Sequence, residues 1–450
     1  MINAVGHPNS DRRSPLERML GLFTDVRGGE GSTVLALAFN VFLILTAYYM
    51  IKPVREALIL SVPGGAELKS YASAGQALLL LLLVPAYGWL ASRVPRMRLI
   101  DSVTLFFAAC LVMFYLLITA GFSMAIAFFL WVGVFNLMVP AQFWAFANDI
   151  YSPEAGKRLF VLVAFGASCG AVFGSFLANE MIHYVGVYEM LLLAAGLLAS
   201  TLLLSHWVNR RELRTPGEEV NAHPQEPLEP GNAFGFVFRN RYLLLLAFVL
   251  LLTNWVNSNG EYILGRIVKD AADAAALGPA AVSEEEFIAS FYAGYFGIVN
   301  LLGMLLQLLL VSRIIKYIGV PIAICLLPAI TIGSYATIMM LPVLGVVRWV
   351  KTAENATDYS LQSTVNQVLY LPTTRTEKYK AKQAIDTFFV RAGDVCSAGL
   401  VLAGTHVFTF GVGDFAVATM ALSTLWLLLS IRLGLRFRTL VPTKPEKIEL

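Results

Sequence analysis

Charged side chains recur inside apolar stretches of this sequence, and they are the residues that could do chemistry. The segment AYYMIKPVREALILS holds Lys52, Arg55 and Glu56. Tyr48 and Tyr49 share their helical face, because the spacings are three and four residues. Lysine and arginine in such a place can bind phosphate or carboxylate oxygens as charged donors, and an acidic neighbour can hold them oriented.

A second polar series lies between residues 343 and 371. Its members are Arg348, Lys351, Asn355, Asp358, Gln362 and Asn366. Their spacing of three or four residues puts all of them on one helical face, which cannot face lipid. We expect this face to line a cavity or to contact other helices. A ladder of internal salt bridges that contacts no substrate is the alternative.

Other candidates are spread over three apolar segments. They are Asn254, Trp255, Asn257 and Glu261 in one segment, Glu354 beside the series above, and Asp386, Arg391 and Asp394 in a third. Arg391 and Asp394 are three residues apart, so they could pair with each other or contact a ligand. Lys52 also has two interpretations, as a cavity residue or as a helix end that extends its ammonium group to the membrane surface.

Composition identifies the elements that must position these groups. Of the 450 residues, 57% are hydrophobic and 14% are charged, whereas soluble domains have about 25% charged residues. Apolar runs of about 20 residues, the length that crosses a bilayer, recur along the chain. Helices are therefore expected to span a membrane. The four cysteines are scattered, which favours neither disulfides nor a metal site, and we expect no cofactor.

The apolar runs predict an all-α polytopic membrane protein with twelve transmembrane helices in two six-helix halves. The predicted spans are 33–60, 71–91, 99–120, 123–149, 159–182, 186–208, 241–264, 287–311, 318–341, 343–371, 384–405 and 412–433. The predicted domains are an N-terminal arm (1–32), a first half (33–208), a polar linker (209–240), a second half (241–433) and a tail (434–450).

The distribution of lysine and arginine predicts the orientation. Of the 33 such residues, 25 lie in or at the edge of segments on one side, and only Lys69, Arg266 and Lys269 lie in loops on the other. Because basic loops stay inside, both termini and the linker are expected to be cytoplasmic.

A weak parallel repeat relates the two halves. NDIYSPEAGKRLF and LYLPTTRTEKYKAKQAID each join a polar-ended helix to a helix rich in small residues through a short basic loop. Two such six-helix halves are typical of the major facilitator fold. In that fold the first, fourth, seventh and tenth helices line the central cavity, and these are the helices that carry most of the polar groups named above.

Other motifs have structural interpretations. Gly166, Gly170 and Gly174 form a small-residue ridge that predicts close helix packing. The GVGD motif that ends at Asp414 lacks a suitable partner aspartate and is interpreted as a helix cap. No phosphate-binding GxxxxGK[ST] loop occurs. We therefore expect a transporter with no catalytic residues rather than an enzyme or an ATP-driven pump.

Three stretches resemble the ATP/ADP translocase family of plastids and intracellular bacteria. They are IKPVREALILS, FWAFANDIYSPEAGKRLF and YSLQSTVNQVLYLPTTRTEKYKAKQAID. The resemblance implies antiport of ATP and ADP by alternating access, hence nucleotide binding, in a bacterial inner membrane. Pro53 stands where the family has an acidic residue, while Lys52, Arg55 and Glu56 keep the rest of that motif.

Under this hypothesis Lys52, Arg55, Arg348, Lys351 and Arg391 bind phosphates, together with Asn254 and Asn257. Tyr48, Tyr49 or Trp255 stack on a base. Charge pairing or coupling falls to Glu56, Glu261, Glu354, Asp358, Asp386 and Asp394. The expected partners are a small-molecule substrate and the lipid bilayer, without nucleic acid, and the protein is expected to be a monomer.

Two alternatives remain open from the residues. One is a transporter of a non-nucleotide anionic or amphiphilic solute, coupled to protons through Glu56, Glu261 or Asp358. The other is a membrane scaffold that does not transport, against which the short loops and tails argue.

Overall fold

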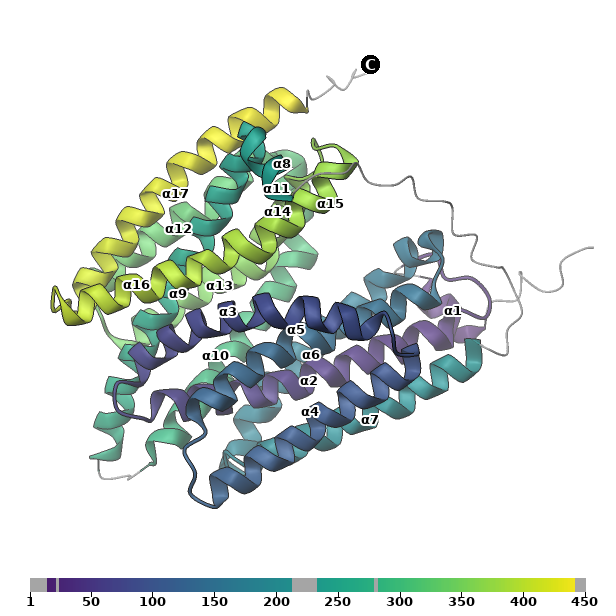
Figure 1. Cartoon of the computed structure of the whole chain (residues 1–450), viewed down its shortest axis with the longest axis horizontal. Coiled ribbons are helices and arrows are strands. Elements are labelled where there is room, and N and C mark those ends of the chain that lie inside the picture. Colours follow the sequence, from purple (N-terminus) through teal and green to yellow (C-terminus); the bar gives the residue numbers. More distant parts are fainter. Residues whose placement is uncertain (1–13, 22–23, 213–232, 279–281, 442–450) are drawn as a thin grey trace, which may run out of the picture. The chain divides into compact units, whose positions relative to one another are not determined.

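Helices form all the regular structure of the described chain. The computed structural model describes residues 14–21, 24–212, 233–278 and 282–441, and no strand occurs among them (Figure 1). The helices are α1 (Pro15–Leu20), α2 (Gly31–Leu60), α3 (Gly65–Ala91), α4 (Arg96–Thr119), α5 (Ala125–Ile150), α6 (Pro153–Val185), α7 (Met190–Glu212), α8 (Ala233–Arg239), α9 (Arg241–Ala276), α10 (Glu284–Leu306), α11 (Ser312–Tyr317), α12 (Val320–Met340), α13 (Leu344–Thr357), α14 (Ser363–Val368), α15 (Arg375–Ala384), α16 (Val390–His406) and α17 (Val412–Leu440).

Three π-helical turns join neighbouring helices without a break. They are Gln307–Val311 between α10 and α11, Asp358–Gln362 between α13 and α14, and Ile385–Phe389 between α15 and α16. Such turns insert one extra residue per turn and are frequent at functional sites. Two of the three contain acidic residues singled out from the sequence, Asp358 and Asp386.

Eleven of the described helical runs are long and apolar enough to cross a membrane. The continuous run 344–368, formed by α13, its π-helical turn and α14, is also of membrane length, at about 1.5 Å per residue. It carries the polar series predicted for the tenth helix. The prediction of an all-α polytopic membrane protein is thus confirmed, and this run supplies the twelfth helix.

Several helices extend beyond the predicted spans, among them two whose extensions carry charged residues. α3 begins at Gly65 rather than at residue 71, and α9 continues to Ala276 rather than ending at residue 264. Both differences have one cause. Each added segment carries charged residues, so a hydropathy criterion excludes it from the predicted span, although charged residues can be part of a helix. Most of the predicted linker 209–240, and most of the predicted tail, lie outside the described residues.

The chain divides into two compact units. Unit 1 comprises Met1–Arg55, Tyr87–Met124 and Trp131–Pro224, and unit 2 comprises Glu56–Ala86, Ala125–Leu130 and Gln225–Leu450. The helices α2, α3 and α5 each contribute residues to both units. Each unit is therefore described by the contacts among its own residues.

In unit 1 the glycine ridge of α6 lies directly against α2. A Cβ atom on Gly170 would overlap the carbonyl oxygen of Phe42, and Gly166 and Gly174 approach the α2 backbone in the same way. The Thr46 hydroxyl donates to the Gly170 carbonyl oxygen at 3.3 Å, a contact that needs this close approach. The predicted packing role of the three glycines is confirmed.

Replacing Gly170 by alanine is expected to lower the free energy of unfolding by about 1–3 kcal/mol, because the added methyl group forces α2 and α6 apart. Gly196 on α7 is the matched control, since a Cβ there meets nothing within 4 Å. Thermal unfolding of both variants in detergent should show a lower midpoint for Gly170→Ala only. Equal midpoints would contradict the packing role.

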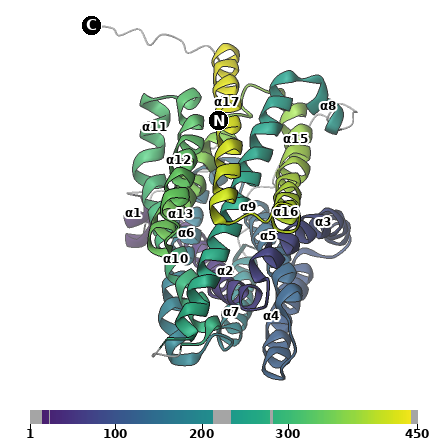
Figure 2. The same cartoon turned by 90° about the vertical axis from the view of Figure 1, so that its left-hand side faces the viewer.

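In unit 2 the long helix α9 is central. It packs against α10, α13, α16 and α17, and α12 packs along α17. Both views show α12 beside α17 (Figures 1 and 2). α9 begins at Asn240, whose side chain accepts a hydrogen bond from the backbone N–H of Tyr242 at 2.9 Å and so caps the helix.

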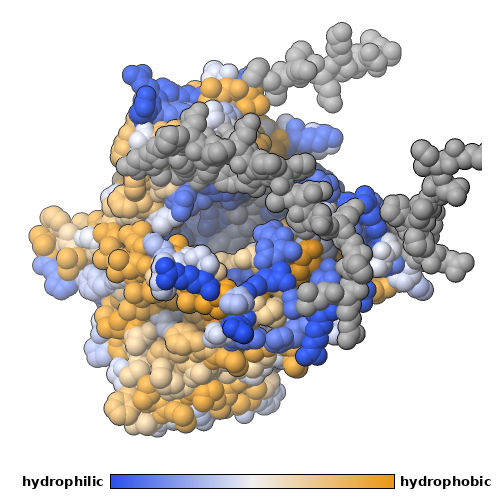
Figure 3. All heavy atoms as spheres, turned by 45° about the vertical axis from the view of Figure 1, so that its right-hand side comes forward, coloured by the Kyte–Doolittle hydropathy of each residue, from blue (hydrophilic) through white to orange (hydrophobic). Residues whose placement is uncertain are grey.

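Large apolar side chains remain exposed on the helices. Leu82, Leu203, Phe106 and Leu308 have more than half of their surface exposed. Figure 3 shows wide hydrophobic areas on the visible face of the molecule. A surface of this kind suits contact with lipid chains rather than with water.

Candidate functional site

A buried ion-pair cluster in unit 2 joins α2, α3 and α9. The Lys69 ammonium lies 2.8 Å from Glu56 Oε2 and 3.4 Å from Glu261 Oε2. It also lies 5.2 Å from the centre of the Tyr292 ring on α10, within reach of a cation–π interaction. Glu56 is fully buried and Lys69 is 5% exposed. One ammonium group thus serves two carboxylates in a water-poor setting.

Glu261 connects this cluster to α13. The Asn355 amide donates to Glu261 Oε1 at 3.2 Å and to the Tyr295 hydroxyl at 2.8 Å. Tyr295 in turn donates to the backbone carbonyl of Lys351 at 3.3 Å. Buried polar groups of this kind require partners, and the chain of contacts supplies them. It fixes α13 in register with α9 and α10.

Lys351 is the second buried ammonium group of unit 2. It is 1% exposed and lies 2.5 Å from Glu354 Oε2, one turn along the same helix. It approaches α9 at Gly260, where a Cβ atom would collide with Lys351 Nζ and with the Tyr335 hydroxyl of α12. Glycine at this position leaves the space in which the ammonium group lies.

A third acid–base pair lies on α16 and is hydrogen-bonded to α9. Arg391 Nη1 is 3.5 Å from Asp394 Oδ2. Asp394 Oδ1 accepts from the Asn254 amide at 2.9 Å and from the Ser258 hydroxyl at 2.7 Å. The mutual pair, one of the two interpretations left open from the sequence, is present in the structure.

The remaining predicted residues of unit 2 are placed around these pairs. Arg348 lies 5.6 Å from the Phe291 ring centre, and Asp386 accepts from the Tyr370 hydroxyl at 3.3 Å. Trp255 lies on α9, where its backbone nitrogen lies so close to Gly393 of α16 that a Cβ atom on this glycine would collide with it. The structure thus distributes the predicted residues over several separate contacts rather than gathering them at one point.

Unit 1 holds four of the candidates, all on α2. The rings of Tyr48 and Tyr49 meet edge to face at 5.0 Å, and Lys52 Nζ lies 5.3 Å from the centre of the Tyr49 ring. Lys52 is 8% exposed, so its ammonium group is buried rather than extended to the surface. Arg55 follows one turn later, and α2 continues as a helix through Pro53 to Leu60.

Lys69 is the residue that the sequence interpretation missed. The charge distribution places it in a loop on the outer side, whereas the structure buries it on α3. The helix begins at the end of the turn SVPGG. This turn, followed shortly by Lys69 and then by a long apolar run, is the signal that could have predicted Lys69 to be helical. Glu56 pairs with Lys69, a partner that the sequence interpretation did not consider.

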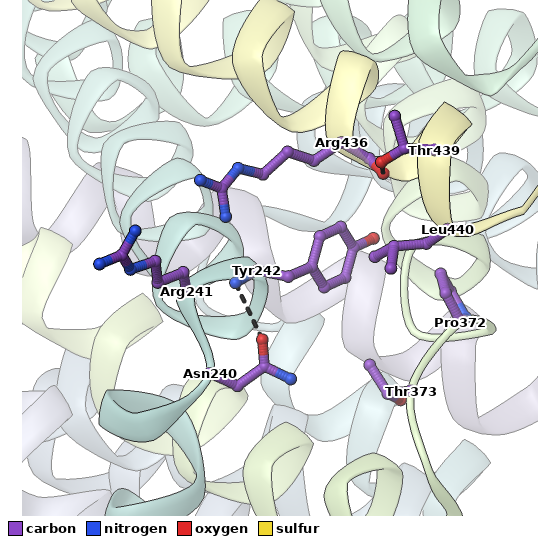
Figure 4. Close-up of a pocket in the computed structure, with 8 residues that line it drawn as sticks. All are labelled: Asn240, Arg241, Tyr242, Pro372, Thr373, Arg436, Thr439 and Leu440. Atoms are coloured by element: carbon purple, nitrogen blue, oxygen red, sulfur yellow. Dashed lines mark hydrogen bonds between the residues drawn. The ribbon is translucent and has the colours of Figure 1, made fainter.

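Two open pockets lie at the ends of unit 2. One, of about 560 Å³, is lined by Glu67, Arg266, Lys269 and Glu284, among others, and Lys269 bonds Glu284 at 2.5 Å. The other, of about 340 Å³, begins at the cap of α9. Figure 4 shows Arg241 and Arg436 extending their guanidinium groups toward the same side of this second pocket. Neither pocket contains a residue predicted as a site residue.

Comparison with known proteins identifies the family. A model of the Major Facilitator Superfamily matches residues 37–367. The chain belongs to this superfamily. This assignment agrees with the major-facilitator-like architecture predicted from the sequence.

Individual relatives are distant. The chain is 24% identical over 352 residues to the ADP,ATP carrier protein 1 of Chlamydia trachomatis, a match that covers 70% of this chain. It spans 65% of the length of that carrier. The resemblance to the ATP/ADP translocases is thus confirmed.

Solved transporters share the fold. A POT family transporter in complex with a thioalcohol-conjugated peptide has a TM-score of 0.64 at 14% identity, over 94% of this chain and 98% of that one. The nucleoside transporter NupG has a TM-score of 0.60 at 13% identity, over 92% and 100%.

Proposed function

We propose that this member of the Major Facilitator Superfamily is an antiporter that exchanges nucleotides of the ATP/ADP type, or a related phosphorylated anion. One observation carries the proposal. Three basic side chains within the membrane-length helices of unit 2, Lys69, Lys351 and Arg391, each hold a carboxylate at 2.5–3.5 Å. A group that binds carboxylate oxygens in this way can bind phosphate oxygens by the same charged hydrogen bonds.

The acid–base pairs suggest how exchange is enforced. While a basic group is paired with its own carboxylate, its charge is compensated in the absence of substrate. A phosphate group that binds must displace that carboxylate. The ion pair forms again when the substrate leaves. Alternating access, expected of the fold, then moves either the loaded or the re-paired site across the membrane. If the empty, re-paired site reorients slowly, the transporter can return across the membrane only with a second substrate bound. We infer that exchange is obligatory for this reason.

The relatives support the proposed substrate class. The matched Chlamydia proteins are ADP,ATP carriers, and Lys52, Arg55 and Glu56 stand where the translocase family keeps two basic residues and an acid. A bacterial inner membrane with both termini in the cytoplasm is part of the same proposal.

A thermal-shift screen on the purified protein in detergent tests the proposal. ATP and ADP are expected to raise the unfolding midpoint, because a ligand at 100 times its Kd stabilises the native state by about 2.7 kcal/mol. Adenosine, which lacks the phosphates that the basic groups bind, is the matched control and should leave the midpoint unchanged. A shift with adenosine alone, or with neither nucleotide, would contradict phosphate recognition.

A further inference from the structure

A basic pocket lies at the end of unit 2 where α9 begins and α17 ends. Its volume is about 340 Å³. Arg241 lines it from α9, Arg436 lines it from α17, and the loop before α15 borders it at Pro372 and Thr373. The distribution of lysine and arginine predicts this end to be cytoplasmic. Because sites for small molecules begin at about 300 Å³, the pocket suits a compact polar group.

Two guanidinium groups give the pocket its charge. Figure 4 shows Arg241 and Arg436 extending them toward the same side. Neither group forms an ion pair within the described part of the chain, and none of the residues that line the pocket is acidic. Glu377, which accepts from the Asn240 amide at 2.9 Å, is already engaged as the cap of α15. The described chain therefore leaves two positive charges of this pocket uncompensated.

The helix ends at the pocket affect the binding of an anion. α9 begins here, and the start of a helix carries about half a positive charge and free backbone N–H groups. The end of α17 has the opposite partial charge but carries a basic residue of its own in the last turn, Arg438. The hydroxyl groups of Thr373 and Thr439 already donate to backbone carbonyl oxygens, at 2.6 and 2.7 Å. Donation to an anion thus falls to the two arginines.

A phosphate group matches these donors. The planar guanidinium group presents a fork of N–H donors that binds two phosphate oxygens at once. Two such groups that extend toward the same side can bind different oxygens of one phosphate. The pocket is therefore suited to a phosphate, which either a lipid headgroup or a free phosphorylated compound can supply.

Apolar side chains beside the pocket favour the lipid. Leu440 lines it, Leu371 directly precedes Pro372 of its border, and Phe238 lies at the end of α8 just before α9. All three have more than half of their surface exposed. Directly after Tyr242, α9 continues with the apolar run LLLLAFVLLL. Arginine next to exposed leucine and aromatic side chains is typical of the level at which headgroups meet acyl chains.

We propose that this pocket binds the phosphodiester headgroup of an anionic phospholipid. Arg241 and Arg436 bind the phosphate, and the acyl chains lie against Leu440 and Leu371. A bound headgroup joins the start of α9 to the end of α17, so it stabilises the folded state of unit 2. The site goes beyond the proposed function, since it requires neither a nucleotide nor exchange.

Thermal unfolding of the full-length protein in a neutral detergent tests the site. Three compounds are titrated: phosphatidylglycerol, phosphatidylcholine, whose headgroup has no net charge, and glycerol 3-phosphate, which lacks acyl chains. The titrations are made in about 0.5 M salt, because diffuse attraction between exposed charges is then largely screened. Phosphatidylglycerol should raise the unfolding midpoint, and the other two should not. An equal rise with glycerol 3-phosphate would overturn the lipid assignment, because a free phosphate would then suffice.

Arginine variants test the pocket itself. Arg241→Gln/Arg436→Gln should raise the phosphatidylglycerol concentration at half-maximal shift by at least about 10-fold. Arg239→Gln/Arg438→Gln removes two exposed guanidinium groups that do not line the pocket and is the matched control, which should leave that concentration unchanged. All four side chains are exposed, so both variants should fold.

A third variant separates charge from hydrogen-bond geometry. Arg241→Lys/Arg436→Lys keeps both charges but loses the planar forks, so its response should be intermediate. Three results would overturn the proposal: no shift with phosphatidylglycerol, a full response in Arg241→Gln/Arg436→Gln, or an equal loss in the control variant. Since no nucleotide is present, failure of nucleotide exchange would not alter these titrations.

Discussion

Lys351→Met is expected to slow the exchange of ATP for ADP strongly. The ammonium group is 1% exposed and bonded to Glu354 at 2.5 Å, so under the proposed function a phosphate would meet it in a setting of low polarity. A hydrogen bond to a charged group contributes about 1.5–3 kcal/mol, which corresponds to a roughly 10- to 100-fold loss of uptake. Methionine is chosen because it keeps most of the side-chain length and flexibility without the charge.

The control for this prediction must separate transport from folding. Lys351→Met leaves Glu354 buried without its counter-charge, so the double variant Lys351→Met/Glu354→Gln should recover thermal stability but not uptake. Lys316→Met removes an exposed ammonium group and should change neither. Uptake by the double variant at the unaltered rate would show that Lys351 serves structure only.

Lys69→Met is expected to cause the largest loss of stability. The substitution leaves two carboxylates, Glu56 and Glu261, without the ammonium group that lies 2.8 and 3.4 Å from them. Removing one partner of a buried ion pair costs about 3–5 kcal/mol, because the remaining charge is not compensated. The unfolding midpoint in detergent, followed by intrinsic fluorescence, should fall well below that of the unaltered protein.

The double variant Lys69→Met/Glu56→Gln tests the cause of that loss. It removes the charge of the fully buried Glu56 and should restore a large part of the stability, whereas Lys69→Met/Asp414→Asn should restore none. Equal midpoints for the two double variants would mean that Lys69 stabilises the protein through packing of its alkyl chain rather than through charge.

The fold can be predicted from the sequence because hydropathy dominates it. Apolar runs of membrane length locate the spans, and the spacing of Gly166, Gly170 and Gly174 correctly predicts close contact along one helix face. The errors fall where charge and helix coincide. A hydropathy criterion excludes Lys69 and the end of α9 beyond residue 264 from the spans because of their polarity, although both are helical.

The sequence predicts which residues belong to the candidate site, but not which of them contact each other between helices. The spacing on α13 predicts that Lys351, Asn355 and Asp358 share a face, and the structure connects Asn355 to Glu261 on α9. Spacing within one helix cannot predict that second contact, because it depends on the rotation and axial shift of two helices.

Counterflow in proteoliposomes tests the central claim most directly. Vesicles that contain the purified protein and are loaded with ADP are expected to take up labelled ATP, while vesicles loaded with adenosine or buffer should take up none above the protein-free background. Correct folding of the reconstituted protein is checked by its unfolding midpoint. Uptake that does not depend on internal ADP, or no uptake by folded protein, would contradict nucleotide exchange.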